Sequence, residues 1–323
     1  MFKKYILGIE TSCDETSASV IDSDLKIISN IIYSQQELHS NYFGVVPELA
    51  SRAHYEKINF VIKESLKKIT LDKINLISYT DEPGLRGALL IGKIVAETLG
   101  YIHKIPVVGV NHLWGHINSL FLSNKKITFP FLSLIISGGH TELSLVLSHK
   151  KRKILGNTRD DAVGESFDKV AKMLNLSYPG GPVIEKLSKK GDKNYIFFKR
   201  PYMSENWDFS FSGIKTSVLY YIKDLSKKRI KINKQLVSNI CASFQEAVCD
   251  TLATKLLNAC DMLGCDTVGI SGGVSANEYI REYIEKKLNC NKIKTFFPDK
   301  NLSTDNAAMI ASAGKNMYFS KTS

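Results

Sequence analysis

YILGIETSCDETSASVI, residues 5–21, and FLSLIISGGHTELSLVL, residues 131–147, share one design. In each stretch an apolar run leads into a short polar turn, and a second run of alternating residues follows. Such runs are typical of strands, so each stretch predicts a strand–turn–strand unit whose turn exposes backbone N–H groups that can cradle phosphate. Because the design recurs about 125 residues later, it indicates a duplicated domain.

Helix-like and strand-like segments alternate around these two stretches. Helices are expected around residues 47–68 and 87–99, and short strands around residues 76–79 and 107–110. The second half continues with a helix over 233–263, a strand over 267–270 and a helix ending at residue 288, whereas 186–200 and 204–213 are expected to be irregular. This alternation predicts an α/β protein built in layers.

Size and composition narrow the class of protein. A chain of 323 residues exceeds one ordinary compact core, so two domains are expected. Hydrophobic content of 44% and charged content of 23% are typical of folded globular proteins. No apolar run is long enough to span a bilayer, and the first residues do not form a signal peptide. Six cysteines without a C-x-x-C pair indicate reduced thiols, so a cytoplasmic protein with no membrane partner is expected.

The positive charge leaves two interpretations open. A net charge of +11 and a pI near 9.2 permit a polyanionic partner such as tRNA. The alternative is a general enrichment in lysine that reflects genome composition. Charge alone does not decide between them.

Two histidines form a candidate metal site. His112 and His116 lie four residues apart, about one helical turn, so both imidazoles can face the same way, and Asn111 is well placed as the helix N-cap. The carboxylate of Asp305 begins another helix-like segment almost two hundred positions later. Two imidazoles and one carboxylate suit a borderline divalent metal. In the alternative interpretation the histidines only pack a helix, and Asp305 is a helix N-cap or first-turn carboxylate. Leu113 stands where a zinc peptidase of the H-E-x-x-H type needs glutamate, which excludes that chemistry.

Glycine-rich turns form a candidate nucleotide site. SGG occurs at residues 137–139 and 271–273, each time after a predicted strand, and YPGGP occupies residues 178–182. Glycine lets the backbone approach an anion or an adenosine ring closely. None of these turns has the spacing of a P-loop or a dinucleotide-binding motif, and ordinary tight turns are the alternative.

Acidic residues follow both strand–turn–strand stretches. Asp14 and Glu15 lie in the first turn. The group after the second turn comprises Asp160, Asp161, Glu165 and Asp168. Asp168 could accept hydrogen bonds from a ribose, and the alternative is a solvated helix face with pairs such as Glu165–Lys169.

Eight ordered motifs together resemble one family over nearly the whole chain. They are GIETSCDET (8–16), GVVPELASR (44–52), SGGHT (137–141), FDK (167–169), YPGGP (178–182), DFSFSGIKT (208–216), GGVSAN (272–277) and TDN (304–306). The chain thus resembles the TsaD family of bacterial tRNA N6-adenosine threonylcarbamoyltransferases.

The resemblance implies a fold and an activity. The fold would be actin/Hsp70/sugar-kinase-like (ASKHA), with two duplicated α/β domains and an interdomain active-site cleft. Residues 1–126 plus 297–323 would form the domain with the metal ligands, and residues 127–296 the domain with most adenylate-binding residues. The enzyme would transfer a threonylcarbamoyl group from threonylcarbamoyl-adenylate to N6 of adenosine 37 in tRNAs that read ANN codons, releasing AMP.

The resemblance also implies site residues and partners. The metal ligands would be His112, His116 and Asp305, with Fe²⁺ favoured and Zn²⁺ as the alternative. The adenylate would be held by Ile135, Ile136, Ser137, Gly138, Gly139, Asp168, Gly181 and Asn277, with Glu185 as a weaker candidate. No general base is identified, and Asp14 and Glu15 are guesses. Besides tRNA and the adenylate, the expected partners are TsaB, a paralogous scaffold, and TsaE, an ATPase.

Three departures from the family pattern concern turnover and stability rather than reaction type. The family's His-His-x-Glu-Gly-His becomes NHLWGH, so Asn111 and Trp114 replace a histidine and a glutamate. Its Ala-Gly-Pro-Gly-Leu becomes DEPGL, with Asp81 and Glu82. If the replaced glycine has positive φ, Glu82 costs about 1 kcal/mol. The chain also stops at residue 323, before the family's usual tail.

Two other functions remain open. An ATP-dependent phosphotransferase or ATPase of the same fold would need Mg²⁺, which prefers oxygen ligands to imidazoles. A non-catalytic scaffold paralogue would be expected to lose the metal and nucleotide residues, which persist here.

Overall fold

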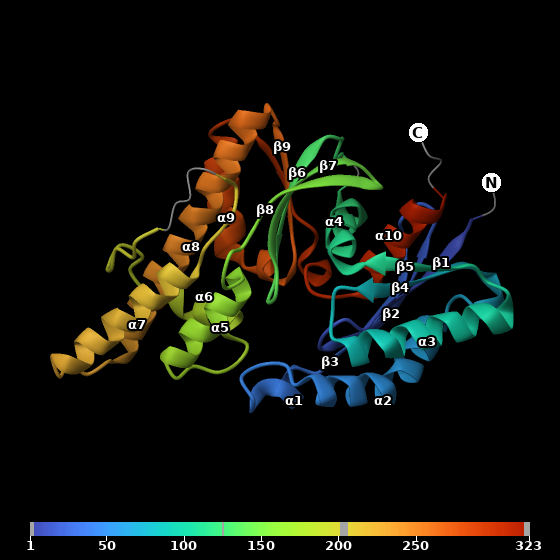
Figure 1. The fold of residues 1–323 in the computed structure, drawn as a ribbon, viewed down its shortest axis with the longest axis horizontal. Helices are drawn as coiled ribbons and strands as arrows, with labels where there is room; N and C mark the ends of the chain where they lie inside the picture. Colours follow the sequence, from blue (N-terminus) through green and yellow to red (C-terminus); the bar gives the residue numbers. More distant parts are fainter. Residues whose placement is uncertain (1–2, 125, 201–205, 320–323) are drawn as a thin grey trace. The chain divides into compact units, whose positions relative to one another are not determined.

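The computed structural model describes residues 3–124, 126–200 and 206–319. The chain forms two compact units, drawn in Figure 1. The first comprises residues 1–127, 148–151 and 298–323, and the second comprises residues 128–147 and 152–297. In the described residues no helix is both long enough and apolar enough to cross a bilayer.

The first unit is built on a five-stranded sheet in the order β3-β2-β1-β4-β5. Its strands are β1 (Tyr5–Glu10), β2 (Glu15–Asp22), β3 (Ile27–Ser34), β4 (Ile74–Glu82) and β5 (Val107–Asn111). β1, β2 and β3 pair antiparallel, whereas β4 pairs parallel with both β1 and β5. The predicted strand–turn–strand unit of residues 5–21 is therefore confirmed as β1 and β2.

Helices cover both faces of this sheet. The helices of this unit are α1 (Gln36–Ser40), α2 (Pro47–Ser65), α3 (Arg86–His103), α4 (His112–Ser123) and α10 (Ala307–Phe319), with short 3-10 turns η1 (Leu71–Lys73) and η3 (Lys300–Leu302). α2 and α3 pack on one face of the sheet and α10 on the other. Leu7 of β1 packs in the core formed with α2 and α3, whereas its neighbour Ile6 packs against α10. Successive side chains of β1 thus enter opposite apolar layers, which is why the strand reads as a continuous apolar run.

The second unit repeats the strand arrangement of the first. Its strands are β6 (Phe131–Ile136), β7 (Thr141–Ser148), β8 (Lys151–Asn157), β9 (Thr267–Ser271) and β10 (Lys294–Phe296). The order is β10-β9-β6-β7-β8, with β6 antiparallel to β7 and parallel to β9, and with β9 parallel to β10. β6, β7 and β9 correspond to β1, β2 and β4 of the first unit.

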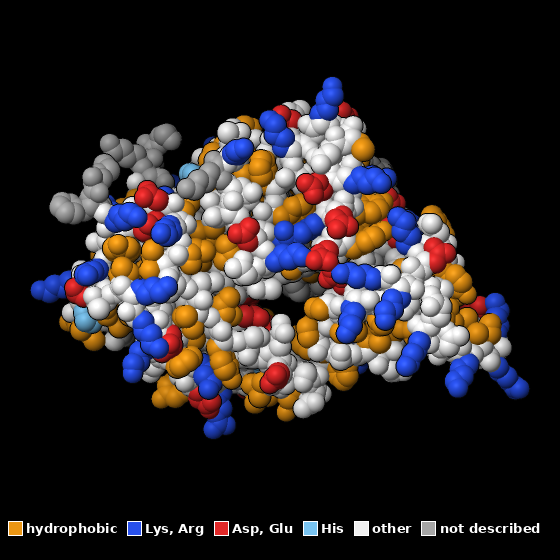
Figure 2. All heavy atoms as spheres, turned by 180° about the vertical axis from the view of Figure 1, so that it is seen from behind, with side chains coloured by type: hydrophobic (Ala, Val, Ile, Leu, Met, Phe, Trp, Pro, Cys, Tyr) orange, Lys and Arg blue, Asp and Glu red, His pale blue; other side chains and the backbone are white. Residues whose placement is uncertain are grey.

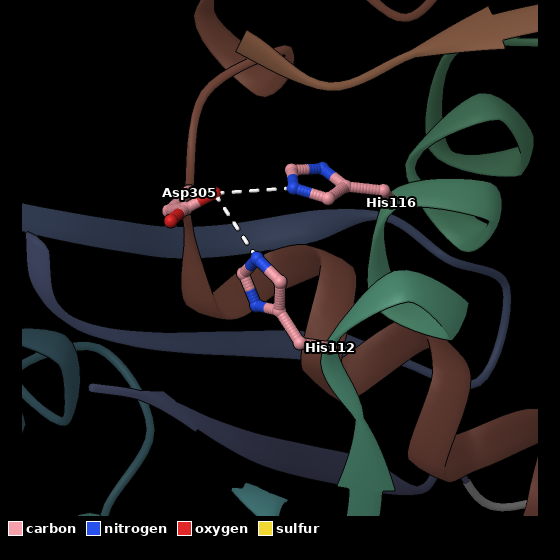
Figure 3. A group of neighbouring side chains, drawn as sticks. All are labelled: His112, His116 and Asp305. Atoms are coloured by element: carbon pink, nitrogen blue, oxygen red, sulfur yellow. Dashed lines mark ion pairs between the residues drawn. The ribbon is translucent and has the colours of Figure 1, made fainter. Parts of the chain in front are cut away.

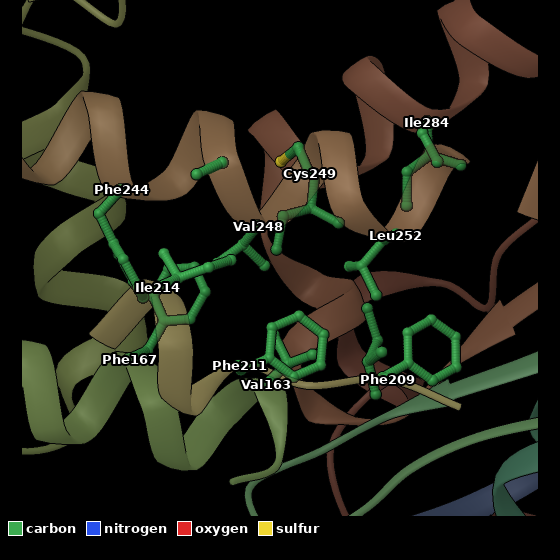
Figure 4. Close-up of a cluster of buried hydrophobic side chains, with 14 of the residues drawn as sticks. Val163, Phe167, Phe209, Phe211, Ile214, Phe244, Val248, Cys249, Leu252 and Ile284 are labelled. Carbon is green, nitrogen blue, oxygen red and sulfur yellow. The ribbon is translucent and has the colours of Figure 1, made fainter. Parts of the chain in front are cut away.

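Its helices are α5 (Val163–Met173), α6 (Gly180–Ser188), α7 (Ser212–Lys227), α8 (Lys234–Leu263) and α9 (Glu278–Asn289), with the 3-10 turn η2 (Gly273–Ala276). Figure 4 shows the aromatic core between them, where the rings of Phe167 and Phe244 lie 5.0 Å apart. Cys249 is buried in this core, and Cys241 and Cys260 are buried free thiols too, as expected of packing residues.

The prediction of an irregular segment over 204–213 is wrong at its end, because α7 begins at Ser212. Residues 204 and 205 lie outside the described residues. Asp160, fifty positions earlier, accepts the backbone N–H groups of Phe211 and Ser212 at 2.9 and 3.2 Å. Because α7 is capped from another part of the chain, the local sequence carries no start signal. The expected irregular segment over 186–200 is also wrong at its start, since α6 continues to Ser188.

Candidate metal centre and nucleotide-binding turns

His112, His116 and Asp305 lie together in the first unit (Figure 3). The Nε2 atoms of His112 and His116 lie 3.5 and 3.2 Å from Oδ1 of Asp305. The two imidazole rings are 4.7 Å apart between centroids and nearly perpendicular, at 79°. One candidate ligand atom from each residue lies within 4.8 Å of the others. The structure therefore brings together the three side chains that the sequence predicted as candidate metal ligands.

Helix ends position these side chains. Asn111 is confirmed as the N-cap of α4, because its Oδ1 accepts the N–H groups of Leu113 and Trp114 at 3.1 and 3.2 Å. The alternative that Asp305 caps a helix or lies in its first turn is wrong. α10 begins at Ala307, and Asn306 accepts the N–H of Met309 at 3.1 Å. Since Asn306 performs the capping, the Asp305 carboxylate is left to face the histidines.

A glycine in β1 allows α10 to come close to the sheet. A Cβ at Gly8 would lie 2.1 Å from the carbonyl oxygen of Ala307, at the first residue of α10. Only glycine permits this approach, which fixes the start of α10 against β1 and so places Asp305.

Glu10 supports the centre and was not identified from the sequence. Its carboxylate is fully buried, and Oε2 lies 3.0 Å from Nδ1 of His112. The same oxygen accepts the Thr80 hydroxyl at 2.7 Å, while Oε1 accepts the Ser12 N–H at 2.5 Å. A carboxylate on Nδ1 fixes the ring and leaves Nε2 to face a cation. The signal in the sequence was an acidic residue at the end of an apolar strand.

The charges at this centre favour a cation. Burial opposes charge on His112, but the carboxylates of Asp305 and Glu10 outweigh it and hold the His112 pKa well above its usual range. Burial likewise opposes ionisation of Asp305, yet the two histidines bring its pKa well below the ordinary value. The carboxylates thus create a negative potential between the three side chains.

The donor set fits a divalent transition metal. His116 is fully buried, and within the described residues neither ring nitrogen has a hydrogen-bond partner beyond the ion-pair approach of Asp305. A buried polar atom without a partner is costly, and a metal–nitrogen bond would satisfy it. Two imidazoles with one carboxylate suit Fe²⁺ or Zn²⁺ better than Mg²⁺.

Asp14 and Glu15 lie beside the centre but not among its ligands. Glu15 begins β2 and is buried, whereas Asp14 is partly exposed in the turn. Burial raises the Glu15 pKa well above its ordinary value, and the nearby charges of Asp14 and Asp305 raise it further. The Glu15 carboxyl is therefore better suited to hold a proton than an ordinary surface carboxylate is.

The glycine turns of the second unit meet at the ends of β6 and β9. Ile135 and Ile136 end β6, and the turn closes by hydrogen bonds between Ser137 and His140 at 2.9 and 3.0 Å. Gly272 has φ of +92°, and a Cβ there would lie 2.4 Å from the carbonyl oxygen of Ile136. By contrast, a Cβ at Gly138, Gly139 or Gly181 would meet no atom within 4 Å, so these glycines border open space.

The remaining nucleotide candidates hold helix ends in place. Asp168 Oδ1 accepts the N–H of Gly180 at 2.7 Å, and Glu185 Oε1 accepts the N–H of Glu278 at 2.9 Å. Asn277 caps α9 through the N–H of Ile280 at 3.0 Å. These bonds gather the candidates around the N-termini of α6 and α9, where backbone N–H groups favour anions. The Glu165–Lys169 pair is confirmed at 2.8 Å.

The departures from the family pattern are accommodated locally. Glu82 ends β4 and is not among the described residues with positive φ, so the expected cost of about 1 kcal/mol does not arise. The carboxylate of Asp81 forms an ion pair with Lys93, with 3.5 Å between Oδ1 and Nζ. Trp114 packs against an apolar cluster that includes Met309 and Ile310 of α10.

Known proteins resemble the chain over most of its length. The family model for tRNA N6-adenosine threonylcarbamoyltransferase (TsaD) matches residues 26–312. Enzymes of that name from Endomicrobium trichonymphae and Clostridioides difficile (strain 630) are 50% and 48% identical, over 95% of this chain and 91% of each relative.

Solved structures show the fold alone. Full-length HypF has a TM-score of 0.65 at 13% identity and covers 98% of this chain and 47% of its own. Component A of (R)-2-hydroxyglutaryl-CoA dehydratase from Acidaminococcus fermentans has a TM-score of 0.55 at 14% identity, over 97% of this chain and 98% of its own. On the strength of the family match and its two close relatives, the chain belongs to the tRNA N6-adenosine threonylcarbamoyltransferase (TsaD) family.

Proposed function

We propose that this chain transfers a threonylcarbamoyl group from threonylcarbamoyl-adenylate to N6 of adenosine 37 in tRNAs that read ANN codons. AMP is the leaving group. The observation that carries the proposal is the buried centre of His112, His116 and Asp305 in a chain that belongs to this family. Because tRNA and the adenylate precursor occur in the cytoplasm, we place the activity there.

The reaction is an acyl transfer to a weak nucleophile. The lone pair of the exocyclic amine is delocalised into the adenine ring, and the carbamoyl-phosphate anhydride compensates with a good leaving group. A bond forms between N6 and the carbamoyl carbon, the carbon–oxygen bond to AMP breaks, and N6 loses a proton. The protein must orient amine against carbonyl and stabilise the charge that develops on oxygen and phosphate.

In this proposal His112, His116 and Asp305 hold one divalent cation, with Fe²⁺ favoured over Zn²⁺. When bound, the cation supplies a Lewis acid for the substrate's oxygens. Glu10 keeps the His112 ring oriented through its bond to Nδ1. Three protein ligands leave coordination positions free for substrate.

The adenylate would be held by the second unit. Its candidate residues are Ile135, Ile136, Ser137, Gly138, Gly139, Asp168, Gly181, Asn277 and the weaker Glu185. Two features support this assignment: the open space beside the glycines, and the helix N-termini of α6 and α9 near the other candidates. In this proposal the metal ligands and the adenylate-binding residues act on one substrate. The fold would be a duplicated ASKHA fold with domains 1–126 plus 297–323 and 127–296. The substrate would bind in the cleft between these domains. The recurring strand arrangement supports the duplication.

Proton removal from N6 would fall to Glu15 or Asp14. Glu15 is the stronger candidate, because burial and the nearby charges of Asp14 and Asp305 raise its pKa, which makes its carboxylate a stronger base. TsaB and TsaE are the proposed protein partners, by membership of the family.

The two other functions are less well supported. A phosphotransferase or ATPase would rely on Mg²⁺, and the imidazole ligands do not favour that ion. A non-catalytic scaffold would have no use for a buried centre in which, among the described residues, the His116 ring makes no hydrogen bond beyond its ion-pair approach to Asp305.

The proposal is tested by incubating the protein with threonylcarbamoyl-adenylate and unmodified tRNA, with and without the two partners. Nucleoside mass spectrometry should find the threonylcarbamoyl group at adenosine 37 of a tRNA that reads an ANN codon. A tRNA that reads a GNN codon should remain unmodified. Release of γ-phosphate from ATP without modification of adenosine 37 would favour the phosphotransferase instead.

A further inference from the structure

The positive charge of the chain is concentrated in one segment. Residues 186–234 contain thirteen lysines and arginines and four acidic residues, a net charge of +9. The remainder of the chain carries only +2. A general enrichment in lysine does not explain this distribution, because it would spread the charge along the sequence.

The described residues of this segment, 186–200 and 206–234, belong to the second unit, where several of them contact α7 and α8. Its first part runs alongside α8, since Gln235 donates to the carbonyl of Lys190 at 3.0 Å and the N–H of Ile196 donates to Ser243 at 3.1 Å. The ring of Phe198 lies 6.3 Å from Tyr221 of α7, which joins this part to the α7–α8 hairpin. In the view from behind (Figure 2), Lys and Arg side chains protrude at the lower right, where the tip of this hairpin lies.

Many of these cations are not neutralised. The basic surface is defined here as the exposed residues of the segment that form no ion pair with any described residue. These are Lys186, Lys190, Lys199, Lys223, Lys227, Arg229, Lys231 and Lys234. Other cations of the segment are paired within the unit, as Lys193 is with Glu246 at 3.3 Å and Lys215 is with Asp161 at 2.5 Å.

Exposed aromatic rings lie among the cations. Tyr195, Phe197 and Tyr220 are 52%, 81% and 65% exposed. The guanidinium of Arg200 lies 4.4 Å from the centre of the Phe197 ring. Lysines neutralise phosphates, and exposed aromatic or guanidinium planes stack on unpaired bases, so the combination suits RNA with a single-stranded loop.

We propose that the basic surface binds the backbone of tRNA and that its exposed aromatic rings stack on unpaired bases. The inference rests on the proposed function, which requires tRNA but assigns it no surface on this chain. An anionic membrane surface would also attract these charges and rings, so RNA is preferred because the proposed function requires tRNA, and the test includes anionic vesicles.

The test compares two triple variants of the full chain. Lys223→Gln, Lys227→Gln and Lys231→Gln remove three charges from the basic surface, and Lys63→Gln, Lys68→Gln and Lys73→Gln remove three exposed lysines of the first unit. Binding of unmodified tRNA is measured by fluorescence anisotropy across a KCl series. The first variant should bind roughly 10- to 100-fold more weakly, and the slope of log Kd against log[KCl] should fall by about 2 to 3. The control variant should match the wild type.

A second variant separates stacking from charge. Phe197→Ser should weaken binding roughly tenfold while leaving the salt slope unchanged, since it removes a ring and no charge. In the transfer assay the variant that lacks three lysines of the basic surface and the Phe197→Ser variant should each raise KM for tRNA and leave kcat unaltered.

Equal tRNA affinity and slope in the two triple variants would overturn the inference. So would a first variant that loses only binding to vesicles of phosphatidylcholine and phosphatidylserine. Because binding is measured without adenylate, the two proposals fail separately. A wild type that binds tRNA through this surface yet never modifies it would contradict the proposed function and leave the inference standing.

Discussion

The two strand–turn–strand units differ in the turn after the first strand, although the strands around them are arranged alike. In the first unit the turn carries the buried hydroxyl groups of Thr11 and Ser12 between the buried carboxyl groups of Glu10 and Glu15, and Glu10 accepts the Ser12 N–H. In the second unit the turn is bare glycine, and in the described structure the N–H groups of Gly138 and Gly139 have no protein acceptor. The expectation that both turns can cradle phosphate stays a prediction, and in the first turn the Ser12 N–H already has an acceptor within the protein. In the proposed function the first unit thus binds a cation through side chains, and the second binds the adenylate partly through backbone N–H groups.

The largest effect is expected at the charged centre. His116→Ala removes a buried candidate ligand, so it should lower threonylcarbamoyl transfer by at least about 10³-fold while the protein stays folded. Circular dichroism, metal content and product formation are measured together. His103→Ala, an exposed histidine at the end of α3, is the matched control. A His116→Ala protein that kept one metal per chain and full activity would remove the centre from the account.

A smaller effect is expected from a change at Glu10, which contacts His112 without being a candidate metal ligand. Glu10→Gln keeps an acceptor for Nδ1 of His112 but loses the negative charge, so metal should be retained roughly 10- to 100-fold less tightly. Metal remaining after dialysis against graded chelator is the readout, with the exposed Glu97→Gln as control. Unchanged retention would show that Glu10 serves only the packing of β1.

A substitution in the glycine turn after β6 should weaken binding of the adenylate without lowering the stability of the fold. Gly138→Ala adds a methyl group in open space, so the melting temperature should stay constant while KM for the adenylate rises roughly tenfold. Gly272→Ala is the contrast, because its positive φ and the nearby Ile136 carbonyl should cost about 1–3 kcal/mol of folding free energy. If Gly138→Ala lowered the melting temperature as Gly272→Ala does, the turn would be structural and not a binding loop.

The smallest effect is expected at the acidic residues beside the second turn, which serve the fold. Burial opposes ionisation of Asp161, but Lys169 and Lys215 outweigh it and lower its pKa. Its ionised form therefore stabilises the fold above the unfolded-state pKa near 4, and this stability is lost as pH falls through the lower folded-state value. Asp161→Asn should cost about 1–2 kcal/mol at pH 7, because one lysine is partly solvent-screened, and less at pH 3.

Urea unfolding at both pH values measures this difference. The exposed Asp266→Asn, whose nearest lysine nitrogen lies 3.8 Å away, should change little at either pH. A cost for Asp161→Asn that grew as pH fell would contradict the assigned direction of the pKa.

Local patterns predicted much of this structure. The apolar runs located β1, β2, β6 and β7, and helical spacing with an N-cap at Asn111 placed both histidines on one side of α4. Contacts between distant segments were not predictable in the same way. The cap that Asp160 provides for α7 and the bond from Glu10 to His112 join residues about 50 and 100 positions apart. The capping role of Asn306, which frees Asp305, was hidden because neighbouring Asp and Asn are equally good caps.

The proposed transfer, with its metal centre, is tested most directly by the ratio of AMP to modified adenosine 37 in one turnover. Protein loaded with one Fe²⁺ per chain is mixed with limiting threonylcarbamoyl-adenylate and excess unmodified tRNA, and AMP and modified adenosine 37 are counted. We expect one AMP for each threonylcarbamoyl group on adenosine 37, and neither product from the His116→Ala protein. AMP without modified tRNA, or equal turnover by His116→Ala, would contradict the proposal.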